Sequence, residues 1–446
     1  MSSEWTIRSR RVVLPEEISP ATIRVRNGAI QAVEPYKLAA DEDAGDLVIM
    51  PGLVDTHVHM NEPGRTEWGG FASVTRDAAA GGITTVIDMP LNSIPPTTSV
   101  KAFDAKVTAA NGQCYVDVGF WGGAVPDNGE ELNSLFDAGC FGFKCFLSPS
   151  GVEEFPALNK QELREVMCQL SRLQARLLVH AELPEFIQCP PAGRSYMGYM
   201  NSRPKAAEDA AIELLLQLSR ETGCAVHVVH LSSADSLQQL RVARAQGVRV
   251  TVETCPHYLA LCGEEIPEGA TECKCAPPIR ESANCEGLWD GLREGVIDMI
   301  VSDHSPCPLH MKNLANGDFE TAWGGIASVH LTLPVLWSEA SRRGFTERDV
   351  VRWMSTAPAD MAGLSGRKGR ISPGNDADMV VWDPSEEFTV DPSLLKFRQS
   401  LTPYSGRRLR GVVKATYVRG REVLSATTPG GALLKRPLST HRAKIA

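Results

Sequence analysis

The sequence predicts an α/β protein, a (β/α)8 barrel of the TIM type with a small β-sandwich domain that is built from both chain ends. Three observations lead to this prediction. Short apolar segments alternate with helical segments along the middle of the chain, polar residues with ligand chemistry stand where several of these segments end, and both chain ends contain short strands joined by turns. Alternating strands and helices are typical of a parallel sheet built from βα units.

The composition narrows the class of protein. The 446 residues suffice for a barrel of about 250 residues and a second domain. The formal net charge is -9, without the long Lys/Arg block that binds nucleic acid or anionic lipid. No apolar run reaches the ~20 residues of a membrane helix, and the N-terminus lacks the apolar stretch of a secretory signal. We expect a cytoplasmic protein without nucleic-acid or membrane partners, with mitochondrial and peroxisomal locations left open. Most of its twelve cysteines are expected to be reduced.

The two chain ends are expected to share one domain. Residues 1–50 and 371–446 form the predicted β-sandwich domain, with an extended or frayed C-terminal arm at the end of the second segment. Asn27-Gly28 is the kind of pair that closes a tight turn between strands. The predicted strands are residues 7–14, 21–26, 29–33, 379–382, 411–418 and 421–424.

Residues 51–370 are expected to form the barrel. Eight strands over about 320 residues match a (β/α)8 barrel. The alternative is an open doubly wound sheet, which often has a Gly-x-Gly-x-x-Gly turn after a strand; this sequence has no such turn. The predicted strands are residues 53–59, 83–90, 116–121, 142–147, 175–180, 225–230, 248–253 and 298–303, and the predicted helices include 72–80, 161–172, 206–221 and 233–246.

Histidines mark the end of the first barrel strand. Side chains alternate along a strand, so His57 and His59 point the same way and can converge on one metal ion. A pair of polar residues on a half-buried strand is the plainer alternative. Active sites of barrel enzymes lie at the carboxyl ends of the strands, so other ligand-type residues there join the candidate set. These residues are His57, His59, Lys144, His180, His230 and Asp303.

Two further side chains need interpretation. His227 stands three residues before His230, hence on the opposite face of a regular strand. It is expected to be structural or to pack under the helices. Lys144 lies between Phe143 and Phe146, where a charged ammonium is costly to bury. It either snorkels or pairs with a carboxylate, or it reacts with CO2 to give a carbamate whose two oxygens bridge two metal ions.

Several short motifs occur in a fixed order along the chain. They are PGLVDTHVH (51–59), NEPG (61–64), AGGITT (80–85), GFK (142–144), VHAE (179–182), VHLS (229–232) and SDHSP (302–306). With these motifs, residues 48 to 385 resemble the cyclic amidohydrolases, a family that includes dihydropyrimidinases, dihydroorotases and allantoinases. The resemblance implies a barrel with a flanking β-sandwich, two zinc ions and a bridging carboxylated lysine. It assigns His57, His59 and Asp303 to the more buried ion, His180 and His230 to the other, and N6-carboxylysine to position 144.

Two positions differ from the patterns of particular members of this family, and they limit which member the chain can resemble. Dihydroorotases carry an Arg at the position of Asn61, and dihydropyrimidinases place a Tyr a few residues after the lysine, where this chain has none. The remaining segments resemble the allantoinases, and imply opening of the hydantoin ring of allantoin to allantoate, a step of purine and ureide degradation. They are residues 61–68, 88–98, 255–259, 302–307 and 322–326.

The expected chemistry is the hydrolysis of a ring amide. A metal-bound hydroxide attacks the carbonyl, and Asp303 accepts its proton and passes it to the departing nitrogen. A neutral substrate rich in N–H and C=O groups requires polar partners. The candidates are Asn92, Ser302, His257 and the backbone near residues 276–278 and 323–325. Asn92 is alternatively a turn residue, and His257 a support for the metal site.

Two alternative functions stay open, another enzyme activity and a non-catalytic role. One is a dihydropyrimidinase or hydantoinase of relaxed specificity, and another is a non-catalytic assembly protein that resembles dihydropyrimidinase, although such proteins have lost ligands that this chain retains. The same ligands also bind Mn, Co or Fe in place of zinc. Family members are commonly homotetramers.

Overall fold

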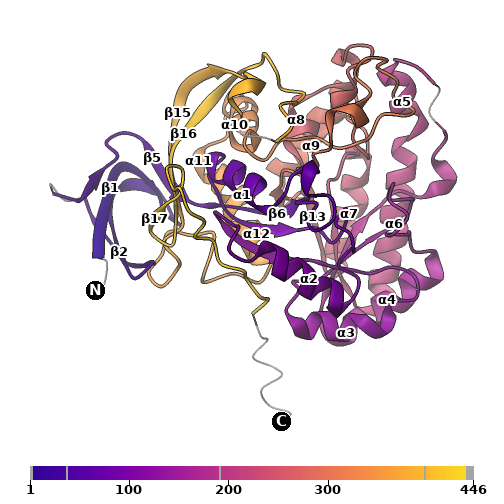
Figure 1. The fold of residues 1–446 in the computed structure, drawn as a ribbon, viewed down its shortest axis with the longest axis horizontal. Helices are drawn as coiled ribbons and strands as arrows, with labels where there is room; N and C mark the ends of the chain where they lie inside the picture. Colours follow the sequence, from indigo (N-terminus) through magenta and orange to yellow (C-terminus); the bar gives the residue numbers. More distant parts are fainter. Residues whose placement is uncertain (1–3, 37–38, 190–191, 396–397, 438–446) are drawn as a thin grey trace, which may run out of the picture.

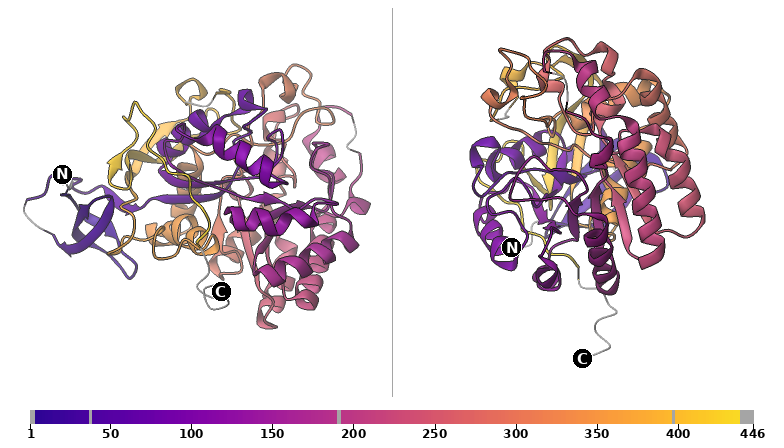
Figure 2. Two further views of the ribbon diagram at one scale, coloured as in Figure 1. Left: turned by 60° about the horizontal axis from the view of Figure 1, so that its bottom comes forward. Right: turned by 90° about the vertical axis from the view of Figure 1, so that its right-hand side faces the viewer.

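The computed structural model describes residues 4–36, 39–189, 192–395 and 398–437. A β-rich domain lies at one end of the molecule, and a barrel surrounded by helices forms the rest (Figure 1). Figure 2 shows the N-terminal strands projecting from the barrel in a view turned by 60°. Each part has its own buried apolar cluster, the larger one in the barrel and a smaller one that includes Ile23, Ile49 and Met379 in the β-rich domain.

The barrel has the predicted eight parallel strand positions. β8 and β9 together occupy the third position, where Trp121 interrupts the strand. Hydrogen bonding gives two runs, β6-β7-β8 and β9 to β14, and a parallel bridge between Val58 and His304 joins the first strand to the last. The strands are β6 (Leu53–Val58), β7 (Ile83–Asp88), β8 (Asp117–Phe120), β9 (Gly122–Gly123), β10 (Phe143–Phe146), β11 (Arg176–His180), β12 (Ala225–Val228), β13 (Val250–Thr254) and β14 (Met299–Ile300).

The helices follow from their apolar faces and caps. In α4, Asn159 and Glu162 form a capping box, and an apolar face that includes Leu163 and Met167 is buried. The helices are α1 (Phe71–Ala80), α2 (Val100–Ala110), α3 (Gly129–Ala138), α4 (Lys160–Leu173), α5 (Tyr196–Ser202), α6 (Lys205–Thr222), α7 (Leu237–Ala245), α8 (Pro256–Ala260), α9 (Ser282–Arg293), α10 (Thr332–Arg342), α11 (Glu347–Val351) and α12 (Ala357–Met361).

One hydrogen-bonded sheet takes strands from both chain ends, in the order β17-β16-β15-β5-β1-β2-β3, with β4 beside β1. β5 joins the two halves, because it pairs in parallel with β1 and antiparallel with β15. The exact domain boundaries stay a prediction. The strands are β1 (Glu4–Val13), β2 (Ile18–Arg26), β3 (Ala29–Pro35), β4 (Glu42–Asp43), β5 (Val48–Pro51), β15 (Met379–Thr389), β16 (Arg408–Val418) and β17 (Arg421–Glu422).

A buried charge cluster ties the barrel to the segment that leads into β15. The ammonium of Lys368 is fully buried and lies 2.7 Å from Asp117, at the start of β8, 2.8 Å from Asp376 and 2.6 Å from Asp378. Arg419 also pairs with Asp117. Because buried charges are costly unless they are paired, these contacts fix the relative positions of elements far apart in the sequence.

The described part of the C-terminal arm packs against the barrel. Ala432 accepts a backbone hydrogen bond from Val118 at 2.9 Å, and Leu434 donates one to Val118 at 2.7 Å, so the arm pairs with β8. A Cβ atom at Gly431 would overlap the carbonyl oxygen of Val116, which explains the glycine. The arm was expected to be extended or frayed; residues 438–446 lie outside the described residues. No helix within the described residues has the length and apolar character needed to cross a bilayer.

Candidate active site

All six ligand-type side chains predicted from the sequence line one cavity of about 370 Å³ at the carboxyl ends of the barrel strands. Ligand atoms of His57, His59 and Asp303 lie within 4.8 Å of one another. Nδ1 of His180 lies 3.1 Å from Nε2 of His230. The fold therefore brings together residues from five strand positions, and their role as metal ligands stays a prediction.

Unusual backbone conformations aim two of these side chains. His230 and Asp303 follow the last residues of β12 and β14, and both have positive φ angles, 38° and 44°. Residues other than glycine rarely adopt this left-handed conformation, and such strain concentrates at functional sites. In β6, the first barrel strand, the register of the pairing with β7 shifts between Asp55 and Val58. The site thus depends on local departures from regular strand geometry.

Hydrogen bonds fix the orientation of three histidine rings. Nδ1 of His57 lies 2.5 Å from Glu253, and Nδ1 of His59 lies 3.1 Å from the carbonyl oxygen of Leu91. Nε2 of His180 lies 2.7 Å from Glu182. A ring that donates one N–H in this way presents the lone pair of its other nitrogen to the cavity, which is how metal-binding histidines are held.

Burial keeps the imidazoles in the form that binds metal. It lowers the pKa of His57, His180 and His230 below the usual histidine value. These rings are therefore neutral near pH 7, and a neutral imidazole is the usual metal-binding form.

The prediction that His227 packs under the helices is wrong. Its Nε2 lies 2.9 Å from Glu253, whose other oxygen holds His57, and its Nδ1 lies 2.8 Å from Oγ1 of Thr251. His227 is thus inside the barrel, below the ligand set. The prediction counted alternation backwards from His230, but β12 ends at Val228 and the left-handed residue 230 breaks that alternation.

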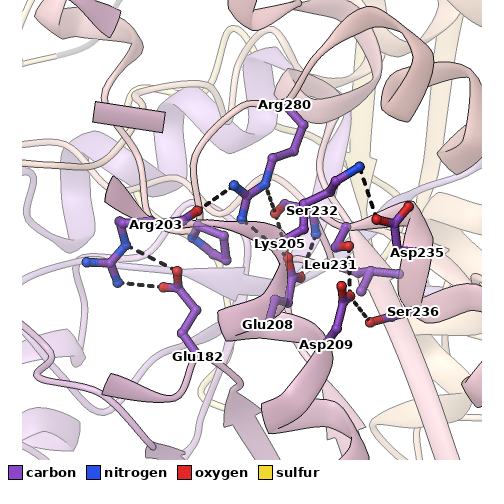
Figure 3. Close-up of polar contacts among 12 residues, drawn as sticks. Glu182, Arg203, Lys205, Glu208, Asp209, Leu231, Ser232, Asp235, Ser236 and Arg280 are labelled. Atoms are coloured by element: carbon purple, nitrogen blue, oxygen red, sulfur yellow. Dashed lines mark hydrogen bonds and ion pairs between the residues drawn. The ribbon is translucent and has the colours of Figure 1, made fainter. Parts of the chain in front are cut away.

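A buried ion pair lies behind His180 (Figure 3). Glu182 accepts hydrogen bonds from Nε of Arg203 at 3.1 Å and from Nη2 at 2.6 Å. Burial alone would raise the pKa of Glu182, but Arg203 and His180 outweigh this effect and lower it to about 2. Glu182 and Glu253 were not among the predicted site residues, although each stands at the end of a barrel strand.

Arg280 supports this region without lining the cavity. Its guanidinium donates to the carbonyl oxygen of Arg203 at 2.5 Å and to Oγ of Ser232 at 3.2 Å. Glu208 accepts hydrogen bonds from the backbone N–H and hydroxyl of Ser232 (Figure 3). These contacts connect the segment after α5 with the loop that follows His230.

Lys144 has the environment that a carboxylated lysine requires. Its side chain is 1% exposed, and its Nζ atom has no hydrogen-bond partner among the described residues. Burial lowers the pKa of Lys144 to about 8, and the neutral amine is the form that reacts with CO2. An unpaired ammonium is costly here, whereas a carbamate would give the facing metal ions two oxygen ligands, so the residues fit a bridged metal pair.

Asp303 stays ionised at the centre of the site. Its Oδ1 lies 3.1 Å from Nε2 of His57 and 3.6 Å from Nε2 of His59. Burial alone would raise the pKa of Asp303, but the surrounding histidines outweigh this effect and hold the pKa well below its usual range. A carboxylate in this position can ligate a cation and accept a proton.

The three predicted substrate contacts have different positions. Asn92 lines the cavity, and its Nδ2 donates to Oδ1 of Asn61 at 3.1 Å. Ser302 and His257 do not line it, contrary to expectation. Ser302 is held below it, where its hydroxyl oxygen accepts the backbone N–H of His304 at 3.0 Å, and His257 is fully buried on the short helix α8. The predicted backbone segments at Ala276 and at 323–325 do line the cavity. Wall residues that were not predicted include Ser150, Gln188, Tyr199, Arg203 and Lys274.

Comparisons with known proteins identify the class. A model of the amidohydrolase family matches residues 48–423. The chain therefore belongs to the amidohydrolase family. It is 51% identical to an allantoinase of Streptomyces avermitilis over 443 residues, 97% of this chain and 99% of the relative. It is 45% identical to an allantoinase of Arabidopsis thaliana, over 94% of this chain and 88% of the relative.

Solved structures share the same overall fold. An L-hydantoinase from Arthrobacter aurescens aligns with a TM-score of 0.91 at 30% identity, over 97% of this chain and 100% of that one. A dihydropyrimidinase from Brevibacillus agri aligns with a TM-score of 0.89 at 26% identity, over 97% and 99% of the two chains. The predicted barrel with an attached β-rich domain is confirmed.

Proposed function

We propose that this protein is an allantoinase, which hydrolyses the ring amide of allantoin and releases allantoate. The observation that carries the proposal is the retention of all six ligand-type side chains around one cavity, in a chain 51% identical to an allantoinase over 99% of that relative's length. Hydantoin rings are cyclic amides too, so the likeness to a hydantoinase agrees with the same reaction class.

We further propose that the site holds two zinc ions. His57, His59 and Asp303 would ligate one ion, His180 and His230 the other, and Lys144, carboxylated by CO2, would bridge them. The support is the clustering of these ligand atoms and the unpartnered Nζ of Lys144. Such a metal pair supplies Lewis acidity and lowers the pKa of bound water toward ~7. Mn, Co or Fe would suit the same ligands.

The protein's own residues position and move the proton. Glu253 and Glu182 hold His57 and His180 with their other ring nitrogens facing the cavity. Asp303, kept ionised, accepts the proton of the attacking water at a carboxylate oxygen and passes it to the ring nitrogen that leaves. Asn92 is the predicted substrate contact that lines the cavity, and we assign it to a polar group of the substrate.

Hydrolysis of racemic allantoin by purified, zinc-supplemented protein tests the proposal, with Lys144→Ala run alongside. We expect the wild type to release allantoate and the variant to release none. If the wild type binds about two metal ions per chain and leaves allantoin untouched, the substrate assignment is wrong. Dihydropyrimidines and unsubstituted hydantoins would then be the next substrates to test.

A second candidate function, that of a dihydropyrimidinase or hydantoinase, is favoured by the TM-score of 0.91 with the L-hydantoinase. Turnover of allantoin and dihydrouracil by one sample separates the two. The non-catalytic alternative predicts no bound metal in protein grown with added zinc. A homotetramer, a cytoplasmic location and a role in purine and ureide degradation are part of the proposal, and the family resemblance supports them. Light scattering would then give four times the 48.4 kDa of one chain.

A further inference from the structure

Lys274 is a cation in the cavity wall that the proposed reaction does not use. It follows the short 3-10 turn Thr271–Cys273, and its side chain lines the cavity. Its Nζ donates to the carbonyl oxygens of Ala322, at 2.6 Å, and Glu320, at 3.3 Å, and lies 5.2 Å from the centre of the Tyr199 ring. Within the described ranges, no carboxylate comes within 4.0 Å of this ammonium.

Arg203, the neighbouring cation of the cavity wall, has a carboxylate partner, whereas Lys274 has none within 4.0 Å among the described residues. The charge of Arg203 is compensated by the buried carboxylate of Glu182. An ammonium has three N–H donors, and two carbonyl oxygens account for two donors of Lys274. The third donor has no hydrogen-bond acceptor among the described residues, and Lys274 lines the cavity. Burial lowers the pKa of Lys274 to about 8, so the ammonium form prevails at neutral pH.

Lys274 shares the cavity with the ligand-type side chains but is not bonded to them. In the part of the chain that the structure describes, no hydrogen bond or ion pair joins Lys274 to the six ligand-type side chains. A substrate whose ring carbonyl lies against those side chains therefore meets Lys274 with a different polar group. A neutral carbonyl oxygen suits it, because a hydrogen bond from a charged donor is stronger than one between neutral groups.

We propose that Lys274 is a specificity-determining residue that donates a hydrogen bond to the carbonyl oxygen of the ureido group of allantoin. This inference rests on the proposed function. Allantoin is a hydantoin with a ureido arm, and unsubstituted hydantoin has no acceptor to offer at that position. A site built to hydrogen-bond a substrate group discriminates against analogues that lack it, because its own polar group is then left unpaired.

The test compares the wild type with Lys274→Met, using allantoin as substrate and hydantoin as a competitive inhibitor. We expect the variant to raise KM for allantoin about 10- to 100-fold, with a smaller change in kcat, as for loss of a hydrogen bond to a charged group. The inhibition constant of hydantoin should change less than about twofold, because hydantoin makes no contact with the ammonium.

Lys312→Met is the matched control. The Lys312 ammonium is also buried and donates to a carbonyl oxygen of the same loop, that of Gly325, but Lys312 does not line the cavity. Lys312 is expected only to hold this loop in place. Loss of its ammonium should therefore change KM for allantoin and the inhibition constant of hydantoin by the same factor. Lys274→Gln, which keeps a donor for Ala322, is the second variant should Lys274→Met not fold.

The outcomes separate the two proposals. If the Lys274 variants change KM for allantoin and the inhibition constant of hydantoin by the same factor, Lys274 only holds residues 320–322 in place. That result would overturn the inference. An absence of allantoin hydrolysis in the wild type would instead overturn the proposed function, before any variant is compared.

Discussion

Glu182 lies 2.7 Å from Nε2 of His180 and is completely buried behind it. The carboxylate takes the N–H of one imidazole nitrogen, which leaves the lone pair of Nδ1 facing His230 across the cavity. Arg203 compensates the charge of Glu182 with two hydrogen bonds. The geometry of this ligand is therefore set by residues that never touch the ion it would bind.

Replacing Glu182 by Gln should weaken metal binding. The amide keeps the size of the side chain but removes the charge that holds the His180 ring, and comparable losses cost about 10- to 100-fold in metal affinity. Metal content after dialysis against graded chelator measures the effect. Glu185→Gln, on the exposed 3-10 turn Pro184–Phe186, is the control and should match the wild type. Equal metal retention by the two variants would refute the positioning role.

Replacing Lys144 by Met should have opposite effects on stability and on metal content. Met has a similar volume and leaves no unpaired amine, so the metal-free variant should be more stable by about 1–4 kcal/mol. Its zinc content should fall, because the proposed bridge is lost. Urea denaturation of the metal-free protein and elemental analysis give the two readouts.

Lys106→Met is the control for the Lys144 variant. The Lys106 ammonium is buried as well, but it lies 2.6 Å from Asp88 and 2.9 Å from the carbonyl oxygen of Met89. The same substitution there leaves a buried carboxylate unpaired and should destabilise the protein by about 3–5 kcal/mol. Destabilisation of similar size at both positions would contradict the assignment of Lys144 as an unpartnered amine.

Lys368→Met should destabilise the junction between the barrel and the β-rich domain. Three carboxylates, from Asp117, Asp376 and Asp378, converge on this ammonium. Removing it leaves Arg419, which pairs with Asp117, and Arg367, which pairs with Asp376, as the remaining cations of the cluster. We expect a loss of about 3–5 kcal/mol in the free energy of unfolding. Urea denaturation followed by tryptophan fluorescence measures it, and a loss below about 1 kcal/mol would argue against the role of this cluster.

Gly431→Ala and Gly430→Ala should differ in their effect. The new Cβ at position 431 would overlap the backbone of Val116, which cannot move without disturbing β8. At position 430 it would meet the far end of the Arg421 side chain, which can swing aside. We expect about 1–3 kcal/mol of destabilisation for Gly431→Ala and much less for Gly430→Ala, measured by thermal unfolding. Equal midpoints for the two variants would mean that the arm is not tightly packed.

The sequence alone was enough for the class of fold and for the six ligand-type residues. The periodicity that predicts strands and helices depends only on neighbouring residues in the chain. The carboxyl ends of barrel strands then converge because of the topology. The sequence could therefore predict that His57, Lys144, His180 and Asp303 lie together. His227 was misplaced for a local reason as well, because the alternation rule assumes a regular strand and residue 230 is left-handed.

The tertiary structure decided the rest. It paired Glu253 with both His57 and His227 and brought Arg203 against Glu182. It also placed Lys274 in the cavity wall and left Ser302 and His257 out of that wall. These relationships join residues that are far apart in the sequence, and each depends on the exact path of a loop or on a break in a strand. The identities of the residues determine which chemistry is available, whereas only packing determines which side chains reach one another.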